Sequence, residues 1–173
     1  MKGSIKKVGL ALGLMLMTAG AYGQQSCNAN ITATAPDADF EVHGDGTVTD
    51  TDTGLMWSVC LAGQTHMLGG TCDGAAFEES WEQAHLTASG ESVGGYSDWR
   101  LPNVNELVSI LELQCEGSAL NENIFPGVAG NTVLWTSTPT TQDGLANSVF
   151  IDVGVPGPDA MMAMYPFLLV REN

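Results

Sequence analysis

The sequence predicts an α+β fold, in which two helices pack on short twisted antiparallel sheets connected by long loops. Three observations predict it: a hairpin-like pair of β-branched segments near the start, two capped helix starts in the middle, and three strand-like runs towards the end. Strands that flank helices, with a strand at the C-terminus, favour α+β over a wound α/β sheet. We find no internal repeat and no heptad pattern in the sequence.

The first strands are expected around a turn rich in aspartate and glycine. Residues 40–43 alternate between apolar and polar side chains, and residues 47–50 (Thr-Val-Thr-Asp) are typical of a strand. Residues 55–58 (Leu-Met-Trp-Ser) form its expected partner, because residues 51–54 supply Asp/Gly turn chemistry. Later strands are expected at 133–138, 147–153 and 166–171.

Both helices are predicted from capping residues. The first follows Ser80, which forms a capping box with Gln83. The second is expected over residues 104–113, because Asn103 can cap it and Glu106 can bond back to the Asn103 amide. Three apolar residues share one face of that second helix: Leu107, Ile110 and Leu111.

The residues before the second helix form the most elaborate motif of the chain. Trp99 and Leu101 alternate around Arg100 as in a short buried strand, and Pro102 holds Leu101 extended. Arg100 either pairs with Glu106 or another carboxylate, or clamps an anion. We favour a buried ion pair with a structural role, because cations are scarce and truncating one partner would leave an uncompensated charge.

The N-terminus is typical of an export signal over residues 1–23. Three lysines precede an apolar run at 8–21, and small residues before and at Gly23 fit a cleavage site. The run has fourteen residues (21 − 8 + 1), too few for a bilayer crossing, which needs about twenty. We therefore expect an exported protein without stable membrane insertion, in the periplasm or at the cell surface of a bacterium. Cleavage leaves an arm over 24–39 and one domain over 40–173.

The charge of the processed chain excludes several partners. All three lysines lie in the signal, so residues 24–173 keep Arg100 and Arg171 against 20 acidic residues, a net charge of 2 − 20 = −18. Such a charge repels nucleic acid, anionic lipid and sulfated polysaccharide. It selects no particular ligand, and the sequence does not indicate an oligomeric state.

The four cysteines all lie beyond the signal. An even number in an exported chain predicts two disulfides, with three possible connectivities. We favour Cys60–Cys72, which closes a glycine-rich loop, and Cys27–Cys115 by elimination. A zinc site is disfavoured, because no two cysteines have close spacing and the histidines are scattered.

Several side chains are candidates for binding. Asp45, Asp50 and Asp52 form an oxygen-rich array that could hold calcium, or they bond local amides as turn residues. We favour the turn role, because the spacing does not fit an EF-hand. Trp57, Trp81, Trp99 and Trp135 either stack on sugars or, as we favour, fill the core. Met161, Met162 and Met164 form either a soft contact surface or, as we favour, internal packing.

An ordered series of motifs from about residue 40 to 171 resembles a known family. The series is Asp45-Gly46-Thr47-Val48-Thr49-Asp50, Thr53-Gly54-Leu55-Met56-Trp57, Cys60, Gly63-Gln64, Cys72, Gly74, Ser80-Trp81-Glu82-Gln83-Ala84, Asp98-Trp99-Arg100-Leu101-Pro102-Asn103, Glu106-Leu107, Asn121, Phe125-Pro126, Trp135-Thr136-Ser137-Thr138 and Leu169-Val170-Arg171. Together these motifs resemble the Lcl C-terminal domain family, named for the Legionella collagen-like adhesin and known as a domain of unknown function. The resemblance implies a C-type-lectin-like fold, related to that of the formylglycine-generating enzymes.

The resemblance supports binding and gives no support for catalysis. The formylglycine-generating enzymes carry copper-binding cysteines near their C-terminus, whereas this chain has none after Cys115. The adhesin domain is associated with sulfated glycans, which a charge of −18 would repel. We therefore predict a non-catalytic binding domain, with calcium as a possible cofactor, that recognises a glycan or a surface protein in an adhesion-related role. The alternative is a structural or accessory subunit of an envelope assembly.

Long loops present the binding surface in such a fold. In this chain the expected loops are residues 61–77, 114–132 and 154–163. A hydrolase triad is disfavoured, because His43, His66 and His85 have no evident nucleophile or carboxylate partner.

Overall fold

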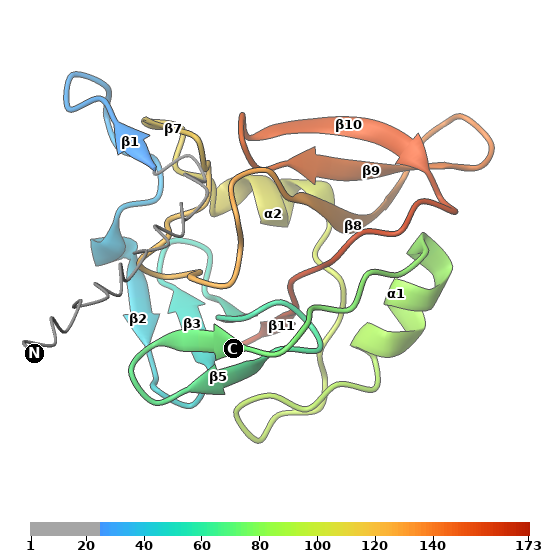
Figure 1. The fold of residues 1–173 in the computed structure, drawn as a ribbon, viewed down its shortest axis with the longest axis horizontal. Coiled ribbons are helices and arrows are strands. Elements are labelled where there is room, and N and C mark those ends of the chain that lie inside the picture. The colour runs from blue at the N-terminus through green and yellow to red at the C-terminus, as the bar shows by residue number, and fades with distance from the viewer. Residues whose placement is uncertain (1–24) are drawn as a thin grey trace, which may run out of the picture.

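The computed structural model describes residues 25–173, so the expected export signal lies outside the described residues. The strands are β1 (Ser26–Cys27), β2 (Phe40–Val42), β3 (Thr47–Asp50), β4 (Leu55–Ser58), β5 (Thr65–Met67), β6 (Thr71–Asp73), β7 (Cys115–Glu116), β8 (Val133–Pro139), β9 (Leu145–Phe150), β10 (Val155–Ala160) and β11 (Val170–Glu172). The helices are α1 (Trp81–Ala88) and α2 (Val104–Ser109), and η1 (Asp37–Asp39) is a 3-10 helix. The fold is thus α+β, as predicted (Figure 1). Neither helix between residues 25 and 173 has the length and apolarity that a bilayer crossing needs.

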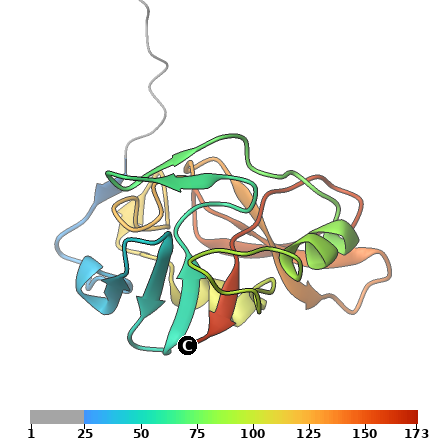
Figure 2. The ribbon, with the colours of Figure 1, turned by 90° about the horizontal axis from the view of Figure 1, so that it is seen from below.

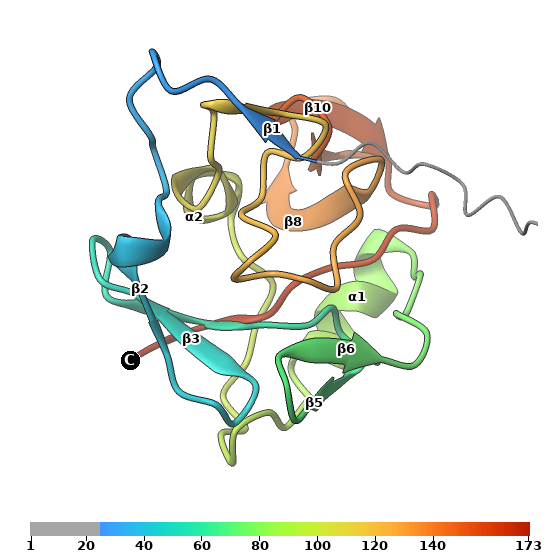
Figure 3. The same cartoon turned by 60° about the vertical axis from the view of Figure 1, so that its left-hand side comes forward.

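Two larger antiparallel sheets organise the chain. The four-stranded sheet has the order β11-β4-β3-β2, and the three-stranded sheet has the order β10-β9-β8. Figure 2 shows the C-terminal strand β11 beside its neighbour in the four-stranded sheet. Two small pairs, β5-β6 and β1-β7, complete the structure, and Figure 3 shows the β5-β6 hairpin beside the four-stranded sheet and below α1.

The buried residues form two apolar clusters, and the alternation of strand side chains divides them. In β4, Leu55 and Trp57 contribute to the first cluster and Met56 to the second. In β8, Leu134 joins the first cluster and Trp135 the second. Helix α2 packs its apolar face on the first cluster, whereas α1 buries alanines in the second. The central strands are therefore covered on both faces, since alternate residues point to opposite sides.

Helix α2 is shorter than the sequence predicts. Its capping box is present, with the Asn103 side chain accepting from the Glu106 amide and the Glu106 carboxylate accepting from the Asn103 amide. The helix was expected to continue to 113 but ends at Ser109. Leu111 instead pairs with Leu120 in an isolated bridge, because the backbone finds partners in a distant segment. The apolar face is buried as predicted.

Strand predictions hold in the hairpin and fail in parts of the C-terminal half. Strands β2, β3 and β4 lie where they were expected. The last strand was expected over 166–171 but covers only Val170–Glu172, although residues 167–170 are all buried. Strand β10 occupies most of the expected loop 154–163. Its two prolines are tolerated because β10 is an edge strand, and they deprive that edge of two N–H donors.

Both disulfides have the favoured pairing. Cys27 joins Cys115 across 88 residues, and Cys60 joins Cys72 across 12 residues. The N-terminal arm is further held by Glu112, whose carboxylate accepts hydrogen bonds from the amides of Thr34 (3.0 Å) and Ala35 (3.1 Å). Residues 25–39 therefore pack against the domain as an ordered part of it.

Candidate functional site

The motif before α2 is a structural ion-pair network. The guanidinium of Arg100 donates to both carboxylate oxygens of Glu106, at 2.8 and 2.9 Å, and also to Glu172 at 3.2 Å. The same Glu106 carboxylate accepts from the Asn103 amide at 2.7 Å. Burial raises the pKa of Glu106, but the bonds from Arg100 and the Asn103 amide outweigh it, so that the pKa lies below its ordinary value.

The predicted pairing of Arg100 is confirmed and its predicted burial is corrected. The Arg100 side chain is 39% exposed and that of Glu106 is 17% exposed. The backbone of Arg100 bridges to Val170, so the residue joins the sheet edge while its side chain lies near the surface. Pro102, by contrast, is buried, and its carbonyl accepts from the Ser137 amide. The terminal nitrogens of Arg100 are therefore bonded to carboxylates of the protein itself, as expected for an ion pair with a structural role.

Three of the four tryptophans fill the core, as we favoured. Trp57, Trp99 and Trp135 are buried, and Trp135 donates its indole N–H to the Glu79 carbonyl at 2.8 Å. Trp81 differs, because it is only partly buried at the start of α1. It is the tryptophan whose ring lines a surface depression.

The aspartate array is not a calcium site. Asp45 precedes β3 and its carboxylate accepts from the amide and hydroxyl of Thr47, whereas Asp50 ends β3 and accepts from Asp52 and Thr53. The length of the strand separates Asp45 from Asp50, since an extended chain rises about 3.3 Å per residue. Among residues 25–173, no group of three or more His, Cys, Asp or Glu is arranged to hold a metal ion. The carboxylates of Asp45 and Asp50 thus have the turn role that we favoured over calcium binding.

The histidines form no catalytic arrangement in the described part of the chain. His43 contacts the Thr49 hydroxyl at 2.8 Å, and His85 lies edge-on to the Trp81 ring with centroids 4.5 Å apart. Within residues 25–173 no histidine side chain hydrogen-bonds to a carboxylate or to a serine hydroxyl. Burial lowers the pKa of His85, and its Nε2 is buried without a partner among those residues.

Two of the three expected binding loops contribute to one groove. This junction groove, of about 360 Å³, is lined by residues from the first expected loop, from the end of the second and from the segment after the third. The lining residues are Leu61, Ala76, Glu78, Asn131, Thr132, Val133, Met164, Tyr165 and Pro166. Apolar residues of the second loop, among them Ala119, Leu120 and Phe125, are buried, and only the end of the loop lines the groove.

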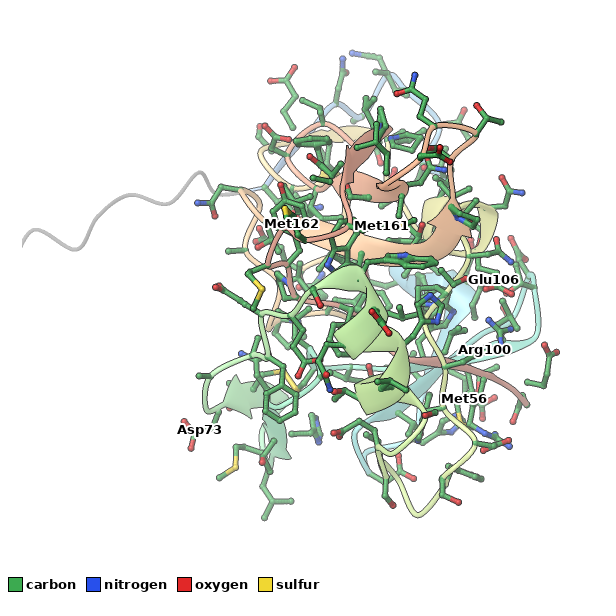
Figure 4. The ribbon with its side chains drawn as sticks, turned by 90° about the vertical axis from the view of Figure 1, so that its right-hand side faces the viewer. Met56, Asp73, Arg100, Glu106, Met161 and Met162 are labelled. Atoms are coloured by element: carbon green, nitrogen blue, oxygen red, sulfur yellow. A yellow bond between two sulfur atoms is a disulfide. The ribbon has the colours of Figure 1, made fainter. Side chains whose placement is uncertain are left out.

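A second depression lies at the start of α1. It has a volume of about 530 Å³ and is lined by Ser80, Trp81, Glu82, Met161 and Met162. Figure 4 shows Met161 and Met162 beside the N-terminal end of α1. We call this second hollow the helix-start depression.

Backbone pairing connects the two hollows. Glu79 and Tyr165 exchange both of their backbone hydrogen bonds, at 3.1 and 3.2 Å, and the Trp81 amide donates to the Met161 carbonyl at 2.9 Å. The segment after β10 therefore runs antiparallel to the residues that lead into α1. Sequence reasoning missed Glu78, because residues 161–165 (Met-Met-Ala-Met-Tyr) are all apolar and show no alternation that would reveal the pairing.

A third hollow is polar. It has a volume of about 390 Å³ and lies between the first loop and residues 91–94. Its lining includes an imidazole (His66), carboxylates (Asp45, Glu91), an amide (Gln64) and an aromatic ring (Phe77). Gly63, which also lines it, has a φ of +87°, and an added Cβ would lie 2.9 Å from the Phe77 ring and backbone. Gly63 thus fixes the position of Phe77 beside this polar pocket.

The protein is a disulfide-linked α+β domain in which three connecting segments line one groove. Over residues 46–171 the chain matches the family model of the Lcl C-terminal domain. That span covers most of the chain, so the protein belongs to the Lcl C-terminal domain family, as the motifs indicated. The match begins at residue 46, a few residues after residue 40, where we expected the domain to start. No curated protein matches the chain with significance.

Proposed function

We propose that the protein is an exported, non-catalytic binding domain that recognises a surface protein through the junction groove and the helix-start depression. The observation that supports this function is the convergence of three segments, distant in sequence, on one groove. Concave sites with apolar walls and a few polar groups are the usual form of binding sites. The two disulfides are typical of an oxidising compartment and support export to the periplasm or the cell surface.

Exposed apolar side chains favour a protein as the ligand. Met162, which is 82% exposed, lines the helix-start depression, and Met164, which is 57% exposed, lines the junction groove. Flexible thioethers are over-used at protein-binding surfaces because they adapt to the shape of a partner. The same contacts would serve whether the protein binds a surface protein transiently or is itself a permanent subunit of an envelope assembly.

A glycan is the second candidate, favoured by the polar pocket. Its carboxylates and amide can bond sugar hydroxyls, and Phe77 can stack on the apolar face of a sugar ring. This ligand would accord with the C-type-lectin-like fold that the family resemblance implies, which stays a prediction. The glycan would be uncharged or cationic, because Asp45 and Glu91 repel sulfate.

The test separates the two ligands with matched variants. Binding is measured between the purified protein and, in turn, an envelope protein fraction and a glycan array, each with calcium and with chelator. Asn131→Arg, which blocks the junction groove, should abolish protein binding, whereas Asn30→Arg on the exposed arm should not. Phe77→Ser should abolish glycan binding, with the similarly exposed Phe150→Ser as its control. Absence of saturable binding to either preparation would overturn the proposed function.

A further inference from the structure

The segment after β10 presents its side chains alternately to the core and to solvent. Met161, Ala163 and Tyr165 pack against the second apolar cluster. Met162 and Met164 are exposed instead. Met162 lies in a turn that is closed by the Ala163 amide donating to the Ala160 carbonyl at 2.8 Å, and Met164 directly precedes Tyr165. The backbone on either side of the two exposed methionines is held by the bonds from Met161 and Tyr165 to the residues leading into α1.

Each of the two hollows combines one exposed methionine with one exposed glutamate. The junction groove contains Met164 and Glu78, and the helix-start depression contains Met162 and Glu82. Trp81 adds an aromatic ring to the second. We call these five residues the Met/Glu surface.

No positive side chain of the described chain neutralises these glutamates. Residues 25–173 contain two arginines and no lysine. Arg100 pairs with Glu106 and Glu172, and Arg171 pairs with Asp98 at 2.7 Å. Within the described residues, neither Glu78 nor Glu82 takes part in an ion pair. The Met/Glu surface is thus apolar and negatively charged at the same time.

This combination matches one kind of side chain. Lysine and arginine carry a long apolar stem that packs on apolar surface and a charged end that stays polar. A stem can lie along a thioether while the charge reaches a carboxylate a few ångströms away, and the face of Trp81 adds a cation–π contact. Two such places lie side by side here, joined by the paired backbone segments.

We propose that the Met/Glu surface binds an extended, basic segment of a partner protein, a proposal that rests on the proposed function and specifies its partner. One cationic side chain of the segment enters each hollow, with its stem on Met164 or Met162 and its charge at Glu78 or Glu82. A second copy of the described chain is a poor occupant, because it offers two arginines that are already paired. Nucleic acid and anionic lipid are repelled by the same charge.

The probe is a fluorescent decapeptide of alternating lysine and serine, titrated with the purified protein at physiological salt and measured by anisotropy. A glutamate–serine decapeptide controls for the sign of the charge and should not bind. A third peptide replaces each lysine by diaminopropionate, which keeps the charge and removes most of the stem. We expect the lysine peptide to bind about tenfold more tightly than the diaminopropionate peptide.

Two pairs of protein variants have equal net charge. Glu78→Gln/Glu82→Gln should weaken binding of the lysine peptide about tenfold, whereas Glu41→Gln/Glu116→Gln, at exposed glutamates elsewhere, should change it less than about twofold. Met162→Ser/Met164→Ser should weaken it similarly, with Val42→Ser/Val153→Ser as the matched exposed pair. Thermal melts establish that each variant is folded.

Each outcome decides the proposal. If both glutamine pairs weakened binding equally, the affinity would depend on net charge alone and the proposal would be overturned. Equal affinity for the lysine and diaminopropionate peptides would overturn it as well. Absence of binding at about 1 mM peptide would also overturn it. Self-association that Met162→Ser/Met164→Ser abolishes would assign the surface to a second copy instead. If the envelope fraction or the glycan array still gives saturable binding, the proposed function survives the failure of this proposal.

Discussion

Two regions near helix α1 use the same residue types in opposite ways. Figure 4 shows Met161 and Met162 at the start of the helix, and Arg100 with Glu106 to one side of it. In the Arg100 region every charge has a partner inside the molecule: Glu106 accepts from the guanidinium and from a backbone amide. On the Met/Glu surface, Glu78 and Glu82 have no ion pair among the described residues.

This difference separates structural charges from charges available to a ligand. A carboxylate that is bonded on all sides contributes to folding, and its loss leaves a partner uncompensated. A carboxylate beside exposed apolar side chains contributes little to folding and can contribute to binding. The partners of a residue, more than its type, therefore indicate its role.

The largest effects on stability should come from the disulfides. Removing Cys27–Cys115 by double serine substitution should lower the free energy of unfolding by about 4–5 kcal/mol, and removing Cys60–Cys72 by about 3 kcal/mol, because the closed loops differ in length. The second change should also weaken ligand binding, since it frees the first loop of the junction groove. Denaturant unfolding under oxidising conditions measures both, and an unchanged midpoint would contradict the pairing.

Truncation of Arg100 should have the next largest effect. Arg100→Ala should destabilise the fold by about 1–2 kcal/mol, less than a fully buried pair, because water screens the half-exposed guanidinium. Arg171→Ala is the comparison variant and should cost a similar amount, because its side chain is less exposed than that of Arg100 (14% against 39%) whereas its partner Asp98 is more exposed than Glu106 (61% against 17%). If Arg100→Ala melted normally yet lost its ligand, the comparison would be reversed and Arg100 would belong to the binding site.

Stability should fall in two steps as the pH is lowered. Burial lowers the pKa of His85 below 6.5, so its neutral form stabilises the fold; this contribution is complete above pH 6.5 and is lost as the pH falls through the folded-state pKa. The pKa of Glu106 lies below 4.5, so its charged form stabilises the fold above pH 4.5, and that contribution is lost at lower pH. Thermal melts from pH 8 to 3 should show both steps.

A matched variant assigns the first of these steps. His85→Phe keeps the ring contact with Trp81 but cannot titrate, so it should remove the step that begins near pH 6.5 and leave the acidic step in place. Persistence of the first step in His85→Phe would place its origin elsewhere.

The smallest effect on stability should come from the Met/Glu surface. Met162→Ser should change the free energy of unfolding by less than about 0.5 kcal/mol, because the side chain is 82% exposed and packs against little. Met161→Ser is the contrasting variant, since Met161 packs on the second apolar cluster and its loss should be measurable. Equal destabilisation by both would remove the distinction between the inner and outer methionines.

Local chemistry was predictable from the sequence, and long-range pairing was not. The two caps depend on residues three apart: the capping box at Asn103 is complete, whereas at Ser80 only the hydroxyl accepts from the Gln83 amide and the Gln83 side chain donates to Thr87 instead. The end of α2 depends on a backbone hydrogen bond from Glu112 to the Ala119 carbonyl, and no local sequence pattern predicts this bond. Strand β10 was missed because prolines argue against a strand unless it lies at an edge.

The candidate site was predicted only in outline. The sequence identified two of the loops but favoured internal packing for the three methionines, of which Met162 and Met164 are exposed. It did not reveal the backbone exchange between Glu79 and Tyr165 that joins the two hollows. It also suggested calcium for Asp45 and Asp50, because residues near in sequence were treated as near in space. A strand separates them instead, with each carboxylate bonded to its own turn.

The nesting of the two disulfides has a consequence for biosynthesis. In a chain exported N-terminus first, Cys27 emerges before Cys60 and Cys72, whereas its partner Cys115 follows 88 residues later. An oxidant that joins thiols in order of arrival would couple Cys27 to Cys60 and trap a non-native species. Maturation therefore requires either that Cys27 stays reduced during translocation or that an isomerase reopens the premature bond by thiolate exchange.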